Sequence, residues 1–299
     1  MAKKEKRIER GGLIGELDYK TAKYKTMYWI IFAILIIVSA VCLLPPIWVL
    51  VSSLKDIEEY YRVPPTIIPR SINFGKLIDL WKSHNFTRYY LNTIYVCAGT
   101  ILFTIVCNGF MGYCVSKMRV KGSKVVFALI LATYLLPNTV SMVPVYMNII
   151  DFPVLHTNML NTYWPLFFMA GANAFMVIVY KSFFDGIPDA LLEAGGIDGC
   201  SDFGLFWRIV LPLSKPVIFT SVILTLNAAW GDFFWPYLIL KDRSKFTIMV
   251  DIFIMNRTSE IQIDTILMSI AISILPPAVM FVFFQKYIMQ GFTMSGIKG

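Results

Sequence analysis

Long stretches without a charged residue are the feature that most restricts what this chain folds into. Each is long enough for a helix of roughly 20 residues to cross the hydrocarbon core of a membrane. They predict six spans, near residues 28–51, 92–116, 125–148, 160–180, 216–240 and 265–285. Buried helices of a large soluble protein are the alternative, but six such runs in 299 residues argue against it. We therefore expect an all-α membrane protein.

The net charge of +8 is better explained by membrane topology than by binding to nucleic acid. With the N-terminus inside, the inner segments hold eight, four, three and two Lys and Arg residues, and the outer segments hold six, none and four. This excess on the inner side follows the positive-inside rule and predicts that both termini are cytoplasmic. The first apolar run is too long for a signal peptide and lacks a small-x-small cleavage site after it.

The expected organisation has three parts. Residues 1–26 form a charged cytoplasmic tail that prefers the membrane surface. Residues 27–91 hold the first span and an external loop, in which VPPTIIPR disfavours helix and a short helix opened by Asn73 follows. Residues 92–299 form a core with five spans and a polar inner loop at 185–215.

The sequence lacks the patterns of an enzyme, a metal site or a nucleotide site. There is no P-loop motif, the five cysteines include no CxxC pair, and no charged residue lies deep in a span. Proton-driven carriers usually need an intramembrane carboxylate or histidine. We therefore expect no catalytic residue, metal or cofactor in this chain, and an energy source in a separate ATPase chain.

The polar inner loop contains DALLEAGGIDGC, from Asp189 to Cys200. Pro188 suits the first turn of a helix, and the carboxylate of Asp189 complements the helix dipole. Ser201 is typical of an N-cap and predicts a second short helix over Phe203–Leu211, stopped by Pro212. Three glycines are expected to end or kink the first helix: Gly195, Gly196 and Gly199. The alternative is a plain hairpin that only links two spans.

This loop resembles the EAA motif of ABC importer permeases, which reads E-A-A, three residues, G, nine residues, I-x-L-P. The matching residues stand at the same spacing: Glu193, Ala194, Gly195, Gly199, Ile209, Leu211 and Pro212. Glycine stands at position 195, where alanine is usual, and this loosens the helix by up to about 1 kcal/mol.

The resemblance extends over about residues 30–299 and points to the carbohydrate-uptake, MalG-like group of permeases. It is carried by LNTIYVCAGTI, LPNTVSMVPVY, LHTNML, WGDFFWPYLIL and the closing QGFTMSGIKG. The resemblance implies the type I ABC importer permease fold, with six transmembrane helices and a cytoplasmic coupling-helix loop, in the inner membrane of a bacterium. It also implies uptake of a sugar or oligosaccharide by alternating access.

The resemblance further implies a set of partners. They are a second homologous permease, two ABC ATPase subunits that bind ATP and Mg, and an extracytoplasmic sugar-binding protein. In such permeases the loop transmits ATPase closure to the spans, which makes coupling residues of Glu193, Ala194, Gly195, Asp198 and Gly199. Its second helix would be anchored by Ile209, Leu211 and Pro212, and the tail at 296–299 would lie near the ATPases.

The path of the sugar is predicted from one segment of the fifth span. Aromatic faces, amides and carboxylates bind sugars, and four such residues occur there: Asn227, Trp230, Asp232 and Trp235. The alternative is an interfacial tryptophan belt with ordinary helix packing. Three intramembrane amides are weaker candidates that equally suit helix joining: Asn108, Asn138 and Asn173. Two other functions stay open, a permease of the same superfamily for a non-sugar solute and a secondary carrier.

Overall fold

The computed structural model describes residues 22–64, 66–72, 74–118, 120–153, 156–258 and 262–295. Most of the expected N-terminal tail, the cap at Asn73 and the closing residues 296–299 lie outside this part of the chain, as does the side chain of Asn138. The described residues form helices and connecting loops, without a strand among them. They divide into two compact units, one ending at Ile72 and one continuing from α3, Phe74–Ser83.

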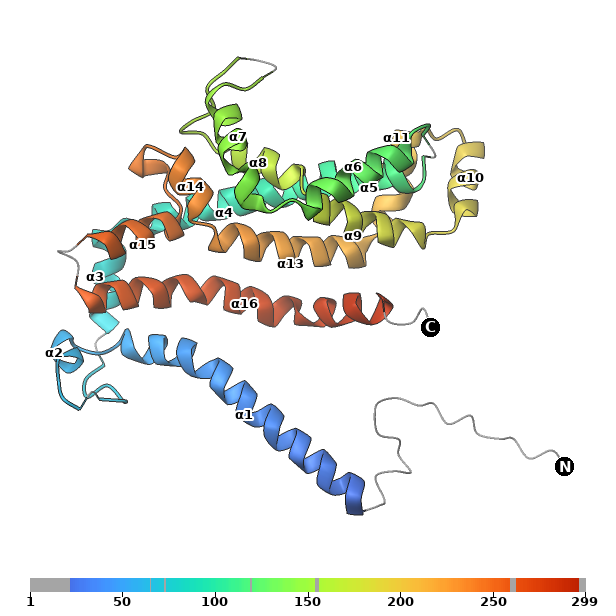
Figure 1. The fold of residues 1–299 in the computed structure, drawn as a ribbon. Coiled ribbons are helices and arrows are strands. Elements are labelled where there is room, and N and C mark those ends of the chain that lie inside the picture. Colours follow the sequence, from blue (N-terminus) through green and yellow to red (C-terminus); the bar gives the residue numbers. More distant parts are fainter. Residues whose placement is uncertain are drawn as a thin grey trace. The chain divides into compact units, whose positions relative to one another are not determined.

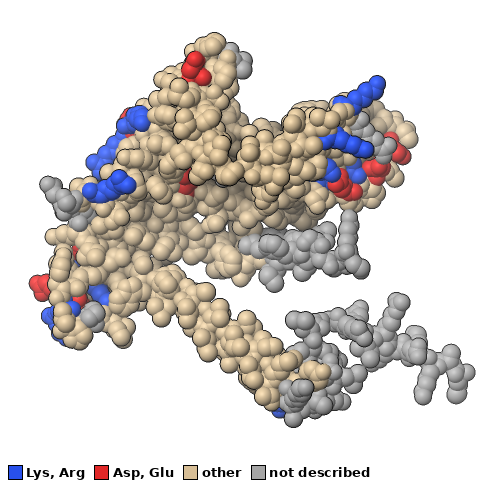
Figure 2. Space-filling view, viewed as in Figure 1, with Lys and Arg blue, Asp and Glu red and all other residues tan. Residues whose placement is uncertain are grey.

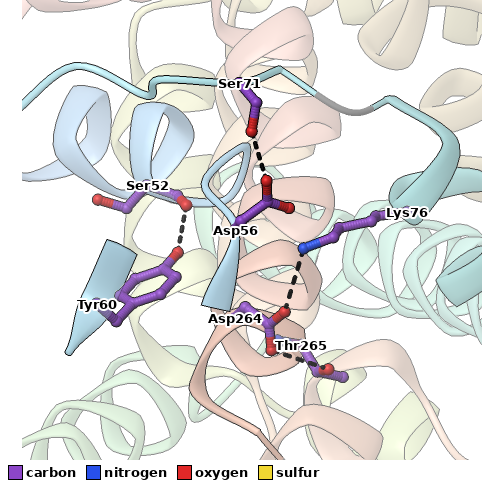
Figure 3. Close-up of polar contacts among 7 residues, drawn as sticks. All are labelled: Ser52, Asp56, Tyr60, Ser71, Lys76, Asp264 and Thr265. Carbon is purple, nitrogen blue, oxygen red and sulfur yellow. Dashed lines mark hydrogen bonds and ion pairs between the residues drawn. The ribbon is translucent and has the colours of Figure 1, made fainter. Parts of the chain in front are cut away.

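The first unit consists of α1, Ala22–Ser52, the short α2, Ile57–Tyr60, and the loop that follows. Glu59 of α2 is buried and binds this loop, since it accepts hydrogen bonds from the hydroxyl of Thr66 at 2.7 Å and the backbone nitrogen of Arg70 at 3.0 Å. The hydrogen bond from Thr66 lowers the pKa of the Glu59 carboxyl. Two further hydrogen bonds close the loop, from Tyr60 to the carbonyl of Ser52 and from Ser71 to Asp56 (Figure 3).

The second unit is a bundle of helices whose longest members lie side by side (Figure 1). Its first half contains α3, α4 (Phe86–Phe103), the π-helical turn η2 (Thr104–Asn108), α5 (Gly109–Ser116), α6 (Ser123–Leu135), α7 (Asn138–Ile150), α8 (Trp164–Gly171) and α9 (Ala174–Asp185). Its second half contains α10 (Asp189–Ile197), α11 (Asp202–Leu205), η3 (Phe206–Val210), α12 (Leu211–Leu213), α13 (Lys215–Gly231), α14 (Phe234–Ile239), η4 (Arg243–Lys245), α15 (Ile248–Arg257) and α16 (Ile263–Ser295).

The helices are long and apolar enough to cross a membrane. In the described residues three of them do so without a sharp bend: α1, the α4–α5 run and α16. Three bent pairs raise the number to as many as six if each pair is one span, with bends of 108° at α6–α7, 43° at α8–α9 and 82° before α13. Figure 2 shows the charged side chains of the second unit concentrated towards its ends.

Three of the expected spans are not single helices in the described residues. Those near 125–148 and 160–180 are the bent pairs α6–α7 and α8–α9. In the span expected near 216–240, α13 ends at Gly231 and α14 is a separate short helix. The break is stabilised by Asp232, whose carboxylate accepts hydrogen bonds from the backbone nitrogens of Phe234 at 2.9 Å and Trp235 at 3.3 Å. A short acidic side chain thereby satisfies backbone donors that the helix leaves unpaired at its start.

Neighbouring helices are held together at each end of the bundle, by close packing at one end and by an ion pair at the other. Near the α10 end, a Cβ on Gly112 of α5 would lie 2.8 Å from the Cβ of Tyr180 and 3.1 Å from the backbone nitrogen of Lys181 on α9. Only a residue without a side chain allows these two helices to approach so closely. Near the other end, Lys76 of α3 pairs with Asp264 of α16 at 3.8 Å (Figure 3).

A buried amide, Asn108 in η2, holds the bend between α8 and α9. Its Nδ2 donates to the carbonyl of Ala170 at 2.8 Å, and its Oδ1 accepts from the backbone nitrogen of Asn173 at 3.0 Å. Asn173 in turn caps α9 by accepting from the backbone nitrogen of Met176 at 3.1 Å. Asn108 therefore joins helices and Asn173 caps one, because backbone groups freed by a bend inside a membrane need a partner within the protein.

Replacing Asn108 by leucine is expected to lower the free energy of unfolding by about 1–3 kcal/mol, because the freed carbonyl and N–H stay buried without a partner. Thermal or denaturant unfolding of the purified chain in detergent measures the change. Asn227→Leu is the matched control, since Asn227 is exposed on α13 and its substitution should shift stability by less than about 0.5 kcal/mol. Equal losses in the two variants would contradict this role of Asn108.

Candidate functional site

The start of α10 is tied to the membrane helices by one lysine. Lys117, at the end of α5, donates from Nζ to the carbonyl of Ile187 at 2.6 Å and to Oδ1 of Asp189 at 2.7 Å. The side chain of Lys117 is only 8% exposed. Asp189 lies in the first turn of α10 after Pro188, as the sequence predicts. The lysine therefore fixes the position of this helix relative to α5.

The end of α10 is closed by a glycine in the left-handed conformation. Gly199 has φ of +81°. Around it, the backbone nitrogen of Cys200 donates to the carbonyl of Gly195, and that of Gly199 donates to the carbonyl of Gly196, both at 3.0 Å. These are the two hydrogen bonds of a Schellman motif, which satisfies carbonyls at the end of a helix. Gly195 and Gly196 lie within the helix, so only Gly199 ends it.

The two sides of α10 have opposite surroundings. Gly195 is buried, and a Cβ added there would lie 2.5 Å from Cδ1 of Ile209 and 2.6 Å from Cδ2 of Leu205. The glycine thus lets the second helix of the loop pack closely against α10. This packing explains why glycine stands at position 195. The remaining expected coupling residues of α10 and its turn are exposed: Glu193, Ala194, Asp198 and Gly199.

Two apolar side chains accompany the exposed coupling residues. Leu191 is 45% exposed and Ile197 is 87% exposed. Figure 1 shows α10 at one end of the second unit, with its axis running across those of α9 and α13. The helix therefore presents a mixed surface of acidic, small and apolar side chains beyond the ends of the long helices.

The second helix of the loop begins where it was predicted and ends later. Ser201 is its N-cap, and its hydroxyl accepts from the backbone nitrogen of Gly204 at 3.2 Å. The expected stop at Pro212 is wrong, because the helical run continues to Leu213 and bends by 82° before α13. Pro212 follows the π-helical turn η3, at the start of α12, where a missing N–H is tolerated.

This second helix is held by buried residues that the sequence reasoning missed. Phe206 and Val210 are fully buried, and the ring of Phe206 lies 5.5 Å from that of Tyr113 on α5. Their spacing of four residues is the signal of a buried helical face. Of the expected anchors, Ile209 and Leu211 pack partly buried against this cluster, whereas Pro212 is exposed.

The four expected sugar-path residues do not share one surface. Asn227 is exposed on α13, but Trp230 is buried and donates from its indole nitrogen to the carbonyl of Ser273 on α16 at 3.1 Å. Asp232 caps α14, and Trp235 packs partly buried against a hydrophobic cluster. Of these four described residues, only Asn227 is an exposed polar residue to which no structural role is assigned.

Comparison with models of protein families shows to which family the chain belongs. The model of the family described as "Binding-protein-dependent transport system inner membrane component" matches residues 85–293. The chain belongs to this family. The match includes the whole loop from α10 to α12 and every membrane helix of the second unit except the end of α16.

Several characterised relatives cover nearly the full chain. The arabinooligosaccharides transport system permease protein AraQ of Bacillus subtilis is 26% identical over 92% of this chain and 95% of its own length. The melibiose/raffinose/stachyose import permease protein MelC of the same species is 28% identical over 94% and 100%. A chain from the crystal structure of a bacterial ABC transporter that imports the acidic polysaccharide alginate superposes with a TM-score of 0.77 at 22% identity, over 89% of this chain and 98% of that one.

Replacing Gly199 by alanine is expected to destabilise the end of α10 by about 1–2 kcal/mol, because an L-residue is strained in the left-handed conformation. Hydrogen exchange of the α10 amides should become faster. Gly196→Ala is the matched control, since neither glycine has an atom within 4 Å of an added Cβ and Gly196 has helical backbone. The prediction fails if both variants accelerate exchange equally.

Replacing Lys117 by methionine is expected to loosen α10 by about 1.5–3 kcal/mol, the range for hydrogen bonds to a charged group. The same exchange measurement, over residues 187–197, reports the change. Lys121→Met, at an exposed lysine four residues further along the chain, should leave the exchange unchanged. Unaltered exchange in Lys117→Met would show that the lysine does not hold the helix.

Proposed function

We propose that this chain is a permease subunit of an ATP-driven importer that takes up a sugar or oligosaccharide. Family membership and full-length relatives named for arabinooligosaccharides and for melibiose, raffinose and stachyose support the substrate class. A relative named for sn-glycerol-3-phosphate, UgpE of Yersinia pestis, favours a non-sugar solute as the second candidate. The secondary carrier is the weaker alternative, because the family is one of binding-protein-dependent transport.

In this proposal α10 is the element that docks on an ATPase subunit. The observation that carries it is the pairing of an exposed, partly apolar surface with a rigid attachment. Ile197 is 87% exposed and lies outside the apolar spans, so its side chain would face water. A partner protein that covers Ile197 would gain binding free energy by removing this apolar surface from water. Lys117 connects the start of α10 to α5, and the buried Phe206 connects the second helix of the loop to α5. A displacement of α10 would therefore reach the membrane helices.

The remaining parts of the importer follow from the same proposal. The chain would have six spans and cytoplasmic termini, pair with a second homologous permease, and dock two ATPases that bind and hydrolyse ATP with Mg. An external binding protein would deliver the sugar; a solved relative is an alginate transporter in complex with a periplasmic protein. The exposed amide of Asn227 stays the candidate contact with the sugar. Helix α1 is exposed along most of its apolar length, which suits contact with lipid.

Affinity capture of the tagged chain from gently solubilised native membranes tests the proposal. We expect a second permease and a P-loop ATPase to co-purify, and the Glu193→Lys variant to lose about tenfold or more of the ATPase, which corresponds to about 1.4 kcal/mol. Glu58→Lys is the matched control, an exposed glutamate of α2 in the first unit. Recovery of the chain alone, in a form that transports when reconstituted, would overturn the ATP-driven reading.

A further inference from the structure

A second polar site lies at the end of the second unit away from α10, where α3, α4 and η4 meet (Figure 1). A pocket of about 300 Å³ opens there. Its lining includes Ser83, Asn85 and Arg88 around the start of α4, and Arg243 and Ser244 from η4. Its volume is near the lower limit of small-molecule sites, roughly 300 Å³. The pocket shares no residue with the coupling loop or with the expected sugar-path residues.

Arg243 is held in place from beneath the pocket. Its Nε donates to the hydroxyl of Tyr89 at 3.2 Å, and a terminal nitrogen lies 3.7 Å from Oδ1 of Asp251. Asp251 is 1% exposed, and burial raises the pKa of its carboxyl. The Arg243 side chain itself remains 68% exposed. A guanidinium fixed on one side and open on the other is prepared to bind a planar anion.

The other residues that line the pocket add a second positive charge and further hydrogen-bond donors. Arg88 supplies a second guanidinium, and His84 also lines the pocket, whereas no acidic residue does. Asp242 lies outside the lining; hydrogen bonds from Ser244, the backbone one at 2.8 Å, lower the pKa of its carboxyl, and the charge of Arg88 adds to this. The pocket is therefore lined by two guanidinium groups and no carboxylate, next to the start of α4, which no side chain caps, while the acidic partner of Arg243, Asp251, lies outside the lining.

We propose that this pocket binds the carboxylate of an acidic sugar, a uronate, at the outer end of the membrane helices. The two arginines would hold the carboxylate, since a guanidinium matches its two oxygens in a bidentate pair. Hydroxyl and amide groups of Ser83, Asn85 and Ser244 would bond the ring hydroxyls. The inference rests on the proposed function, because it assigns a substrate chemistry to a sugar importer.

Binding of galacturonate and galactose to the full chain in lipid nanodiscs tests the pocket, since the two sugars differ in the carboxylate. We expect galacturonate to bind about tenfold or more tightly than galactose, as one charge-assisted hydrogen bond of about 1.5 kcal/mol provides. Arg243→Gln and Arg88→Gln should each remove most of this preference. Arg257→Gln, an arginine of α15 outside the pocket, should leave it unchanged.

A third variant separates the positioning role of Asp251 from direct contact. Asp251→Asn keeps both arginines, so it should weaken galacturonate less than Arg243→Gln does and leave galactose unchanged. Equal affinity for the two sugars in the unmodified chain, or an undiminished preference in both arginine variants, would overturn the proposal. These measurements need no ATPase, so a chain that captures its ATPase but ignores galacturonate would refute the pocket alone.

Discussion

The absence of water in the hydrocarbon core is the constraint on which the rest of this structure depends. A straight helix satisfies its own backbone there, but each bend frees groups that need another partner. In the second unit these partners are particular polar side chains. Asn108 holds the 43° bend between α8 and α9 and Asp232 begins α14. Amides and carboxylates that look like ligand contacts in the sequence are thereby used for the scaffold.

Particular residues also determine how the loop from α10 to α12 is attached to the bundle. Because Gly195 has no side chain, the second helix packs against α10. Because Gly199 tolerates the left-handed conformation, α10 can end in a Schellman motif. Lys117 and Phe206 then fasten the loop to α5 at two points. A helix with fixed ends and an exposed outer surface suits the transmission of a displacement, because little motion is lost within the loop itself.

Polar chemistry is consequently divided between the two ends of the second unit. One end carries the exposed acidic and apolar side chains of α10, and the other carries Arg88 and Arg243, which line a pocket. Between them the described helices bury hydroxyl groups that pair within the protein, such as Tyr180 of α9 with Ser221 of α13 at 2.6 Å.

The sequence by itself determined the helical membrane class, the loop of two short helices and the cap at Ser201, because apolar runs and capping residues act locally. It did not locate the end of the fifth helix at Gly231 or the run through Pro212, since those depend on Asp232 and on a π-helical turn. It also left open whether Trp230 faces a ligand or the core. Only the tertiary structure decided this, because the carbonyl of Ser273 that binds its indole comes from a helix 43 residues away.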